Sequence, residues 1–343
     1  MSKLVYFIVP LAMFFSGITW INLQGIDQVD LELRSMEAQA AAAENNSSLS
    51  LTFCGDRVPT HDFSVKARLE REMNRLVFDP AGADLIYNRS LRYRETFERI
   101  LTKHGVPRDM FYLAIAESNL SNTTSPVGAV GFWQFMEGTA RQYGLEVSET
   151  VDERYHPIKA TNAAARYLRD MYRQFGDWAL VTAAYNMGQG RLGNAMGRQG
   201  ADNYYQLSLN EETSRYLFRV LSAKNLLEKP GHYGVRLKKR KAYKPVPTYA
   251  VQAQENIPDL ITFAAEHGTS YDVLKTLNPW LISAHLEVEP GKTYELRLPL
   301  TEDFHAPELM TNQWGAERRR MDSVAPVVVP LAAADTIPAQ ATE

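Results

Sequence analysis

The sequence predicts a mainly α-helical protein that ends in a small α+β module. Apolar residues recur at helical spacing through most of residues 63–227, and the first segments that resemble strands come after residue 230. With 343 residues, 45% of them hydrophobic, the chain is long enough for about two domains with a sizeable core. We therefore expect an all-helical first domain, with no strand before residue 230.

Residues 1–22 are predicted to be a targeting segment. Lys3 is followed by eighteen residues, 4–21, that carry no charge. Such a run is typical of a secretory signal peptide or of a single membrane anchor, and both alternatives export the rest of the chain. Residues 23–60 are acidic and Ala-rich, then Asn/Ser-rich, without a sustained apolar face. We expect them to form a flexible tether.

Residues 61–229 are expected to form the helical domain. Two amphipathic helices flank it at its start, and five more follow. The predicted helices cover residues 63–78, 85–101, 107–117, 132–143, 158–175, 178–186 and 211–227. Pro107 and Asp109 suit a first helical turn, Gly188 follows the sixth helix, and Pro230 ends the last.

Residues 230–247 are predicted to be a basic linker. Its cationic residues are Arg236, Lys238, Lys239, Arg240, Lys241 and Lys244. They fit either a solvated linker or an anion-binding patch.

The order βααβ is predicted for residues 248–300. A strand at 248–255 and a closing strand at 294–299 enclose short helices at 257–267 and 270–277. Residues 301–343 are biased toward Ala and Pro, so we expect a disordered tail.

The composition argues against several classes of function. With 37 basic and 40 acidic residues the formal net charge is −3, which gives no field that favours nucleic acid. Cys54 is the only cysteine, so an intrachain disulfide is excluded and the thiol is either buried or unpaired. The seven histidines include no pair at metal-ligand spacing. We expect neither a metal nor a cofactor.

Glu117 is the leading candidate for chemistry. It follows the apolar run MFYLAIA, residues 110–116, at the end of a predicted helix. Apolar surroundings and the negative end of the helix dipole both favour the protonated carboxyl, which can then donate a proton near neutrality. The alternative is that Glu117 is merely the first solvated residue after a core helix.

Two polar clusters follow Glu117 in the sequence. The first supplies Ser125, Gly128, Gly131 and Gln134. Its glycines would let the backbone approach a ligand such as a sugar chain, or they form a tight turn before a helix. The second is Tyr185 and Asn186, at the end of another apolar helix, where Tyr185 is alternatively a core aromatic.

Taken together, these segments resemble the catalytic domain of soluble lytic transglycosylases, the goose-type-lysozyme-like murein enzymes, and most of all the membrane-bound lytic murein transglycosylase D type. The resemblance covers about residues 85–228. Its consecutive blocks read PRDMFYLAIAESNLSNTTSPVGAVGFWQFMEGTARQYGL, VDERYHPIKATNAAARYLRDMYRQFGDWALVTAAYNMGQGRL and EETSRYL. The module at 248–300 resembles a divergent LysM peptidoglycan-binding repeat, in which Gln254 and Glu255 replace the usual glycine-aspartate turn.

The resemblance implies a lysozyme-like helical fold and a set of site residues. Glu117 matches the catalytic acid/base, and Ser118 matches a neighbouring hydroxyl that helps to orient the substrate. The substrate-binding residues implied are Ser118, Ser125, Gly128, Gln134, Met136, Tyr185, Asn186 and Glu212. The sequence departs from the family at Glu137, where proline is usual, and at Met187, where alanine is usual.

The resemblance also implies the reaction, which is cleavage of the MurNAc–GlcNAc β-1,4 bond to give 1,6-anhydroMurNAc ends. One carboxyl, acting first as acid and then as base, suffices if the 2-acetamido group of the substrate replaces the second carboxylate. The alternatives are a muramidase that uses water and a non-catalytic adaptor that only binds peptidoglycan. The implied location is the periplasm, with possible anchoring in the membrane. The implied partners are glycan strands, with cell-wall synthases or amidases as candidate protein partners.

Overall fold

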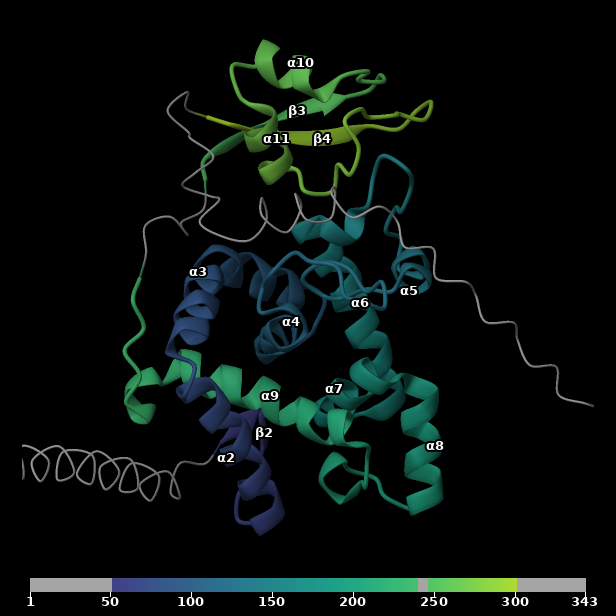
Figure 1. The fold of residues 1–343 in the computed structure, drawn as a ribbon. Helices are drawn as coiled ribbons and strands as arrows, with labels where there is room; N and C mark the ends of the chain where they lie inside the picture. The colour runs from purple at the N-terminus through teal and green to yellow at the C-terminus, as the bar shows by residue number, and fades with distance from the viewer. Residues whose placement is uncertain (1–50, 240–245, 301–343) are drawn as a thin grey trace, which may run out of the picture.

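The computed structural model describes residues 51–239 and 246–300. It shows a helical domain with a small α+β module packed against one side, which lies at the top of Figure 1. The predicted fold class is confirmed. The predicted targeting segment, the tail and the linker residues Arg240, Lys241 and Lys244 lie outside the described residues. No described helix combines the length and apolar character that crossing a membrane requires.

The helical domain contains a short hairpin, eight described α-helices and several 3-10 turns. The hairpin is formed by β1 (Thr52–Phe53) and β2 (Asp56–Arg57). The α-helices are α2 (Phe63–Val77), α3 (Pro80–Lys103), α4 (Phe111–Ser118), α5 (Glu137–Gln142), α6 (Pro157–Phe175), α7 (Trp178–Met187), α8 (Gln189–Gln199) and α9 (Glu211–Glu228), of which α8 was not predicted. The 3-10 turns are η2 (Arg108–Met110), η3 (Glu153–Tyr155), η4 (Tyr204–Gln206) and η5 (Pro230–Tyr233).

The hairpin corrects the prediction that no strand precedes residue 230, and it shortens the predicted tether. Residues 51–60 pack on the helical domain: Phe53 and Val58 are buried in its main core, and the Cys54 N–H donates to the Asp109 carboxylate at 2.7 Å. Two-residue strands contain too few positions to show an alternating pattern. Burial raises the pKa of the Cys54 thiol, which has no disulfide partner.

Helix α4 lies at the centre of the helical domain and packs on α9, which runs beneath it in Figure 1. Its residues 111–115 are each 2% exposed or less. The helix ends where Asn119 takes a left-handed conformation with φ +50°, and the buried Arg89 guanidinium donates to the Asn119 carbonyl at 3.0 Å. The apolar run therefore forms a rigid core helix that carries Glu117 in its last turn.

The helix predicted over residues 132–143 is wrong in its first half, because α5 begins only at Glu137. Gly131 and Gln134 have φ angles of +82° and +47°, which interrupt a right-handed helix. Phe132 and Trp133 are buried, as their apolar character indicates, but they lie in a turn and not in a helix. The Trp133 indole donates to the Thr161 hydroxyl at 2.9 Å and fixes this turn on α6.

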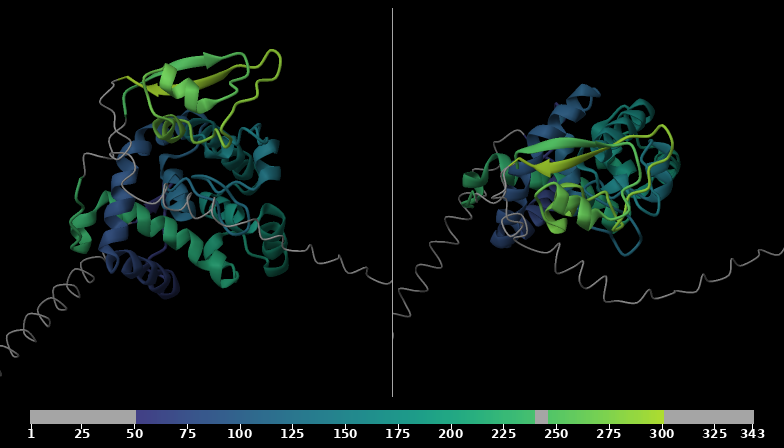
Figure 2. Two further views of the ribbon diagram at one scale, coloured as in Figure 1. Left: turned by 45° about the horizontal axis from the view of Figure 1, so that its top comes forward. Right: turned by 90° about the horizontal axis from the view of Figure 1, so that it is seen from above.

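The predicted βααβ order of the module is confirmed. Strand β3 (Thr248–Ala253) pairs antiparallel with β4 (Tyr294–Pro299), and α10 (Leu260–Glu266) and α11 (Tyr271–Leu277) lie between them in the chain. Helix α10 begins later than predicted because the Asp259 carboxylate accepts from the N–H groups of residues 261 and 262 and so caps it. The turned views in Figure 2 show the module seated directly on the helical domain.

Candidate functional site

Glu117 is held in the last turn of α4 with its side chain only partly exposed. Burial raises the pKa of its carboxyl from an ordinary 4.5 to about 7, against the opposing influence of the Tyr216 hydrogen bond and of Arg219. The carboxyl is therefore protonated in a large fraction of molecules near neutral pH, as a general acid requires.

The Tyr216 hydroxyl donates a hydrogen bond to Oε1 of Glu117. Tyr216 is 1% exposed on α9, and burial raises its pKa well above 10, so it remains a proton donor. Sequence reasoning missed this residue. Tyr216 belongs to the block EETSRYL, but a tyrosine among apolar residues of a helix has the pattern of a core aromatic. Only the packing of α4 on α9 reveals its partner.

Two predicted site hydroxyls bind the backbone of the turn that follows the loop at 121–131. The Ser118 hydroxyl oxygen lies 2.9 Å from the Phe132 carbonyl oxygen and 3.0 Å from the Ala114 carbonyl oxygen. The Tyr185 hydroxyl donates to the Trp133 carbonyl at 2.6 Å. Both side chains thus fix the turn beside Glu117, whose negative charge contributes to raising the Tyr185 pKa.

The loop itself is closed by its own hydrogen bonds. The Ser125 hydroxyl accepts from the Ala129 N–H at 3.0 Å, and the Gln134 amide donates to the carbonyls of Gly131, at 2.8 Å, and Thr123, at 3.1 Å. Gly128 and Met136 are exposed, Met136 by 49%. These predicted residues therefore lie on one stretch, residues 125–136, which comprises the end of the loop and the turn that Ser118 and Tyr185 hold beside Glu117.

Asn186 and Glu212 lie where α7 approaches α9. The Asn186 amide oxygen accepts from the Thr213 hydroxyl at 2.7 Å. Glu212 is exposed and its carboxylate pairs with Arg219 at 2.5 Å. Its charge raises the Glu117 pKa slightly, while that of Arg219 lowers it. The structure thus brings α4, α7 and α9 together around one carboxyl.

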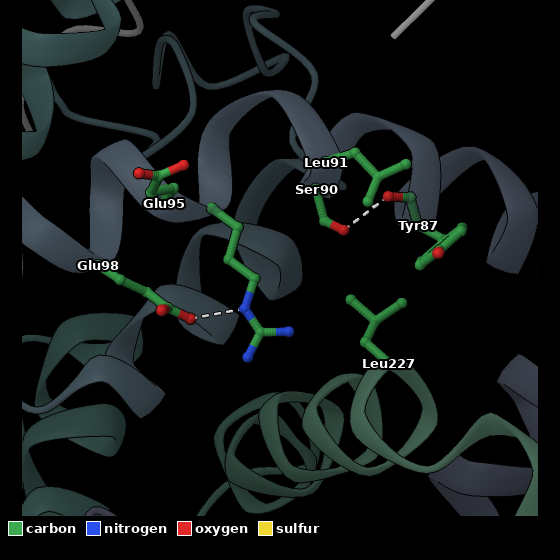
Figure 3. Close-up of a pocket in the computed structure, with 7 residues that line it drawn as sticks. Tyr87, Ser90, Leu91, Glu95, Glu98 and Leu227 are labelled. Atoms are coloured by element: carbon green, nitrogen blue, oxygen red, sulfur yellow. Dashed lines mark hydrogen bonds and ion pairs between the residues drawn. The ribbon is translucent and has the colours of Figure 1, made fainter. Parts of the chain in front are cut away.

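A hollow of about 280 Å³ lies elsewhere on the helical domain, between α3 and the end of α9 (Figure 3). Its lining residues are Tyr87, Ser90, Leu91, Arg94, Glu95, Glu98 and Leu227. On its α3 side, the Arg94 guanidinium pairs with Glu98, one turn further along the same helix, at 2.6 Å. The hollow includes none of the predicted site residues. Among the described residues, no group of three or more His, Cys, Asp or Glu side chains is arranged to hold a metal ion.

Two segments of the chain match models of known protein families. Residues 95–208 match the family model of the transglycosylase SLT domain, and residues 249–302 match that of the soluble lytic transglycosylase C-terminal LysM-like domain. The membrane-bound lytic murein transglycosylase D of Escherichia coli K12 is 34% identical over 141 residues, which are 39% of this chain and 31% of that protein. The soluble lytic murein transglycosylase of the same strain is 31% identical over 144 residues, which are 38% of this chain and 22% of that protein.

A solved structure is also similar in part. The 70 kDa soluble lytic transglycosylase of Escherichia coli aligns with a TM-score of 0.35 and 26% identity, over 42% of this chain and 24% of that one. The match to this chain covers less than a third of the length of each of these two transglycosylases.

Proposed function

We propose that this chain, which carries a transglycosylase SLT domain followed by a LysM-like SLT domain, is a lytic murein transglycosylase that cleaves the MurNAc–GlcNAc β-1,4 bond of peptidoglycan. The observation that carries the proposal is the Glu117 carboxyl, held at the end of a buried helix with a pKa of about 7. The names of the relatives and the two family matches support the same substrate class.

In the proposed reaction Glu117 serves twice. Its proton goes to the glycosidic oxygen as the bond from that oxygen to C1 of MurNAc breaks, and the carbonyl oxygen of the 2-acetamido group stabilises C1. The Glu117 carboxylate then takes the proton of the MurNAc 6-hydroxyl. The 6-oxygen bonds to C1, which closes the 1,6-anhydro ring and returns the proton to Glu117 without consuming water.

The neighbours of Glu117 suit this double role. The Tyr216 hydrogen bond stabilises the carboxylate that forms after the first proton transfer, while burial favours the acid that begins the cycle. Glu212, the acidic residue whose charge reaches Glu117, is exposed and paired with Arg219. It is therefore a poor candidate for the buried second carboxyl that an ordinary glycosidase uses.

The products of digestion in ¹⁸O-labelled water test this function. The protein is incubated with isolated peptidoglycan sacculi, and the soluble fragments are examined by mass spectrometry. We expect fragments one water lighter than hydrolysed ones, with no ¹⁸O at the new ends. Incorporation of ¹⁸O would instead identify a muramidase, and binding without fragments would identify an adaptor.

The proposed site of action is the periplasm, where peptidoglycan lies. The relative named as membrane-bound and the uncharged run at residues 4–21 support an exported protein.

A further inference from the structure

Residues 146–156 join the helical domain to the module by backbone hydrogen bonds. The Asp152 N–H donates to the Trp280 carbonyl at 2.8 Å, and the Ile282 N–H donates to the Thr150 carbonyl at 3.0 Å. Between these two bonds Val151 pairs with Leu281 as an antiparallel bridge. Val151 is 0% exposed and belongs to the hydrophobic core of the module. The helical domain therefore supplies one residue of that core.

Side chains strengthen this junction on both sides of the bridge. The Trp280 ring stacks on His156, with 6.0 Å between ring centroids, and on Tyr294, at 5.6 Å. The Glu146 carboxylate accepts from the Tyr294 hydroxyl at 2.8 Å and pairs with Lys292 at 2.6 Å. Trp280 is 3% exposed. Apolar burial, hydrogen bonds and an ion pair together fix the orientation of the module.

Residues 146–156 also contact the loop at residues 121–135, which carries predicted substrate-binding residues. The Arg154 guanidinium is buried and makes hydrogen bonds to the Asp152 carboxylate, with a shortest distance of 2.7 Å. Its Nη1 also donates to the carbonyls of Gly128 and Phe135, each at 3.3 Å. The Asn122 amide donates to the Tyr155 carbonyl at 2.8 Å.

The contact is close at the backbone as well. A Cβ added to Gly131 would lie 2.1 Å from the Arg154 carbonyl oxygen, so the segment rests directly on this glycine. The turn just after Gly131 is the one held by the hydroxyls of Ser118 and Tyr185. A continuous set of contacts thus runs from Trp280 through Asp152 and Arg154 to the residues beside Glu117.

We propose that the LysM-like module is a brace for the active site: through residues 146–156, with Arg154 as a positioning residue, it holds the loop at 121–135 in its substrate-binding conformation. The module then contributes to turnover itself, besides any affinity for the cell wall. This inference rests on the proposed function. Because Arg154 bonds only to backbone carbonyls of the loop, it acts on the shape of the loop and not on the substrate.

Two pairs of variants in the full chain test the brace. Trp280→Ala weakens the junction. Leu274→Ala removes buried volume from the same module core, but it takes away none of the hydrogen bonds, ring contacts or ion pairs that form the junction. Arg154→Lys keeps the charge but loses the planar fork that spans Asp152 and two carbonyls. Rates are measured on soluble, uncrosslinked glycan strands at a temperature where thermal unfolding shows every variant folded. Hydrogen exchange is followed at the amides of residues 128–131.

We expect Trp280→Ala and Arg154→Lys each to lower kcat about tenfold, because small displacements of positioned groups are costly, and to speed exchange in the loop. Leu274→Ala should leave kcat and loop exchange at wild-type levels. The double variant Trp280→Ala/Arg154→Lys should lose little more than either single variant, since both act through one loop. Equal losses in Trp280→Ala and Leu274→Ala, or a change in KM alone, would overturn the brace. Hydrated products or no products from the wild-type protein would instead refute the proposed function.

Discussion

Replacing Glu117 with glutamine is expected to slow glycan cleavage by about 10³-fold, within the range that general acid–base catalysis contributes. Glutamine has nearly the same shape, and its amide oxygen can still accept the Tyr216 hydrogen bond. It carries no proton that it can donate to the glycosidic oxygen and no charge with which to remove one from the 6-hydroxyl. The initial rate of release of anhydro fragments from sacculi measures the effect.

The matched control is Glu137→Gln, which neutralises an exposed carboxylate on α5 that pairs with Arg141 of the same helix. We expect this variant to cleave at the wild-type rate, and both variants to bind sacculi as the wild-type protein does. A Glu117→Gln protein that still releases fragments at a comparable rate would show that another group is the acid.

The Glu117→Gln variant should also differ from wild type in the pH dependence of its stability. A carboxyl whose pKa is about 7 in the folded protein and 4.5 when unfolded binds its proton more tightly in the folded state. Its favourable contribution is present below 4.5 and is lost as the pH rises toward 7. Urea unfolding should therefore show wild type losing stability relative to Glu117→Gln between these two pH values. Parallel stability curves would contradict the raised pKa.

Gly131→Ala is expected to give the largest loss of stability among the glycine positions of the site, on the order of 3 kcal/mol or more. An alanine there would have to adopt φ +82° and would place its Cβ 2.1 Å from a backbone oxygen of Arg154. A carbonyl in a hydrogen-bonded segment cannot move away as the tip of a flexible side chain can. Relief of the overlap would displace the turn at 132–135 and lower activity as well. Urea unfolding with a parallel rate measurement tests both effects.

Gly176→Ala separates backbone strain from steric overlap. Gly176 ends α6 with φ +67°, and a Cβ there would meet nothing within 4 Å. Strain alone should cost about 1 kcal/mol, with no effect on cleavage. If the two alanine variants were equally stable, the close approach of Gly131 to Arg154 would not exist in solution.

The order of helices was predictable where caps and apolar patterns agree. Helix α7 matches its prediction almost to the residue: Gly188 follows its end as expected, and the structure shows that Asp177 caps its start. The backbone of residues 132–135 was not predictable. Gln134 adopts a left-handed conformation there, and a glutamine side chain gives no sign of that conformation in the sequence. The apolar spacing of this segment correctly indicated that its side chains are buried, but it wrongly indicated a helical backbone.

The site was predictable only in its sequence-local part. Glu117 could be found because the apolar run and the helix end lie beside it in the chain. Tyr216 lies 99 residues away, and its hydrogen bond to Glu117 depends on how α9 packs against α4. The junction at residues 146–156 likewise could not be predicted from the sequence, because Val151 packs in a core whose other buried residues come from the module. Such contacts are properties of tertiary packing and leave no periodic pattern in the sequence.

A titration of the Glu117 carboxyl is the most direct test of the claim that one buried acid carries the chemistry. Carbon-13 NMR of protein labelled at the glutamate side-chain carboxyl, with the Glu117→Gln variant to assign the resonance, gives its pKa in the folded protein. We predict a midpoint of about 7. A midpoint near the ordinary value of 4.5 would mean that Glu117 is ionised at neutral pH and would contradict its role as the proton donor.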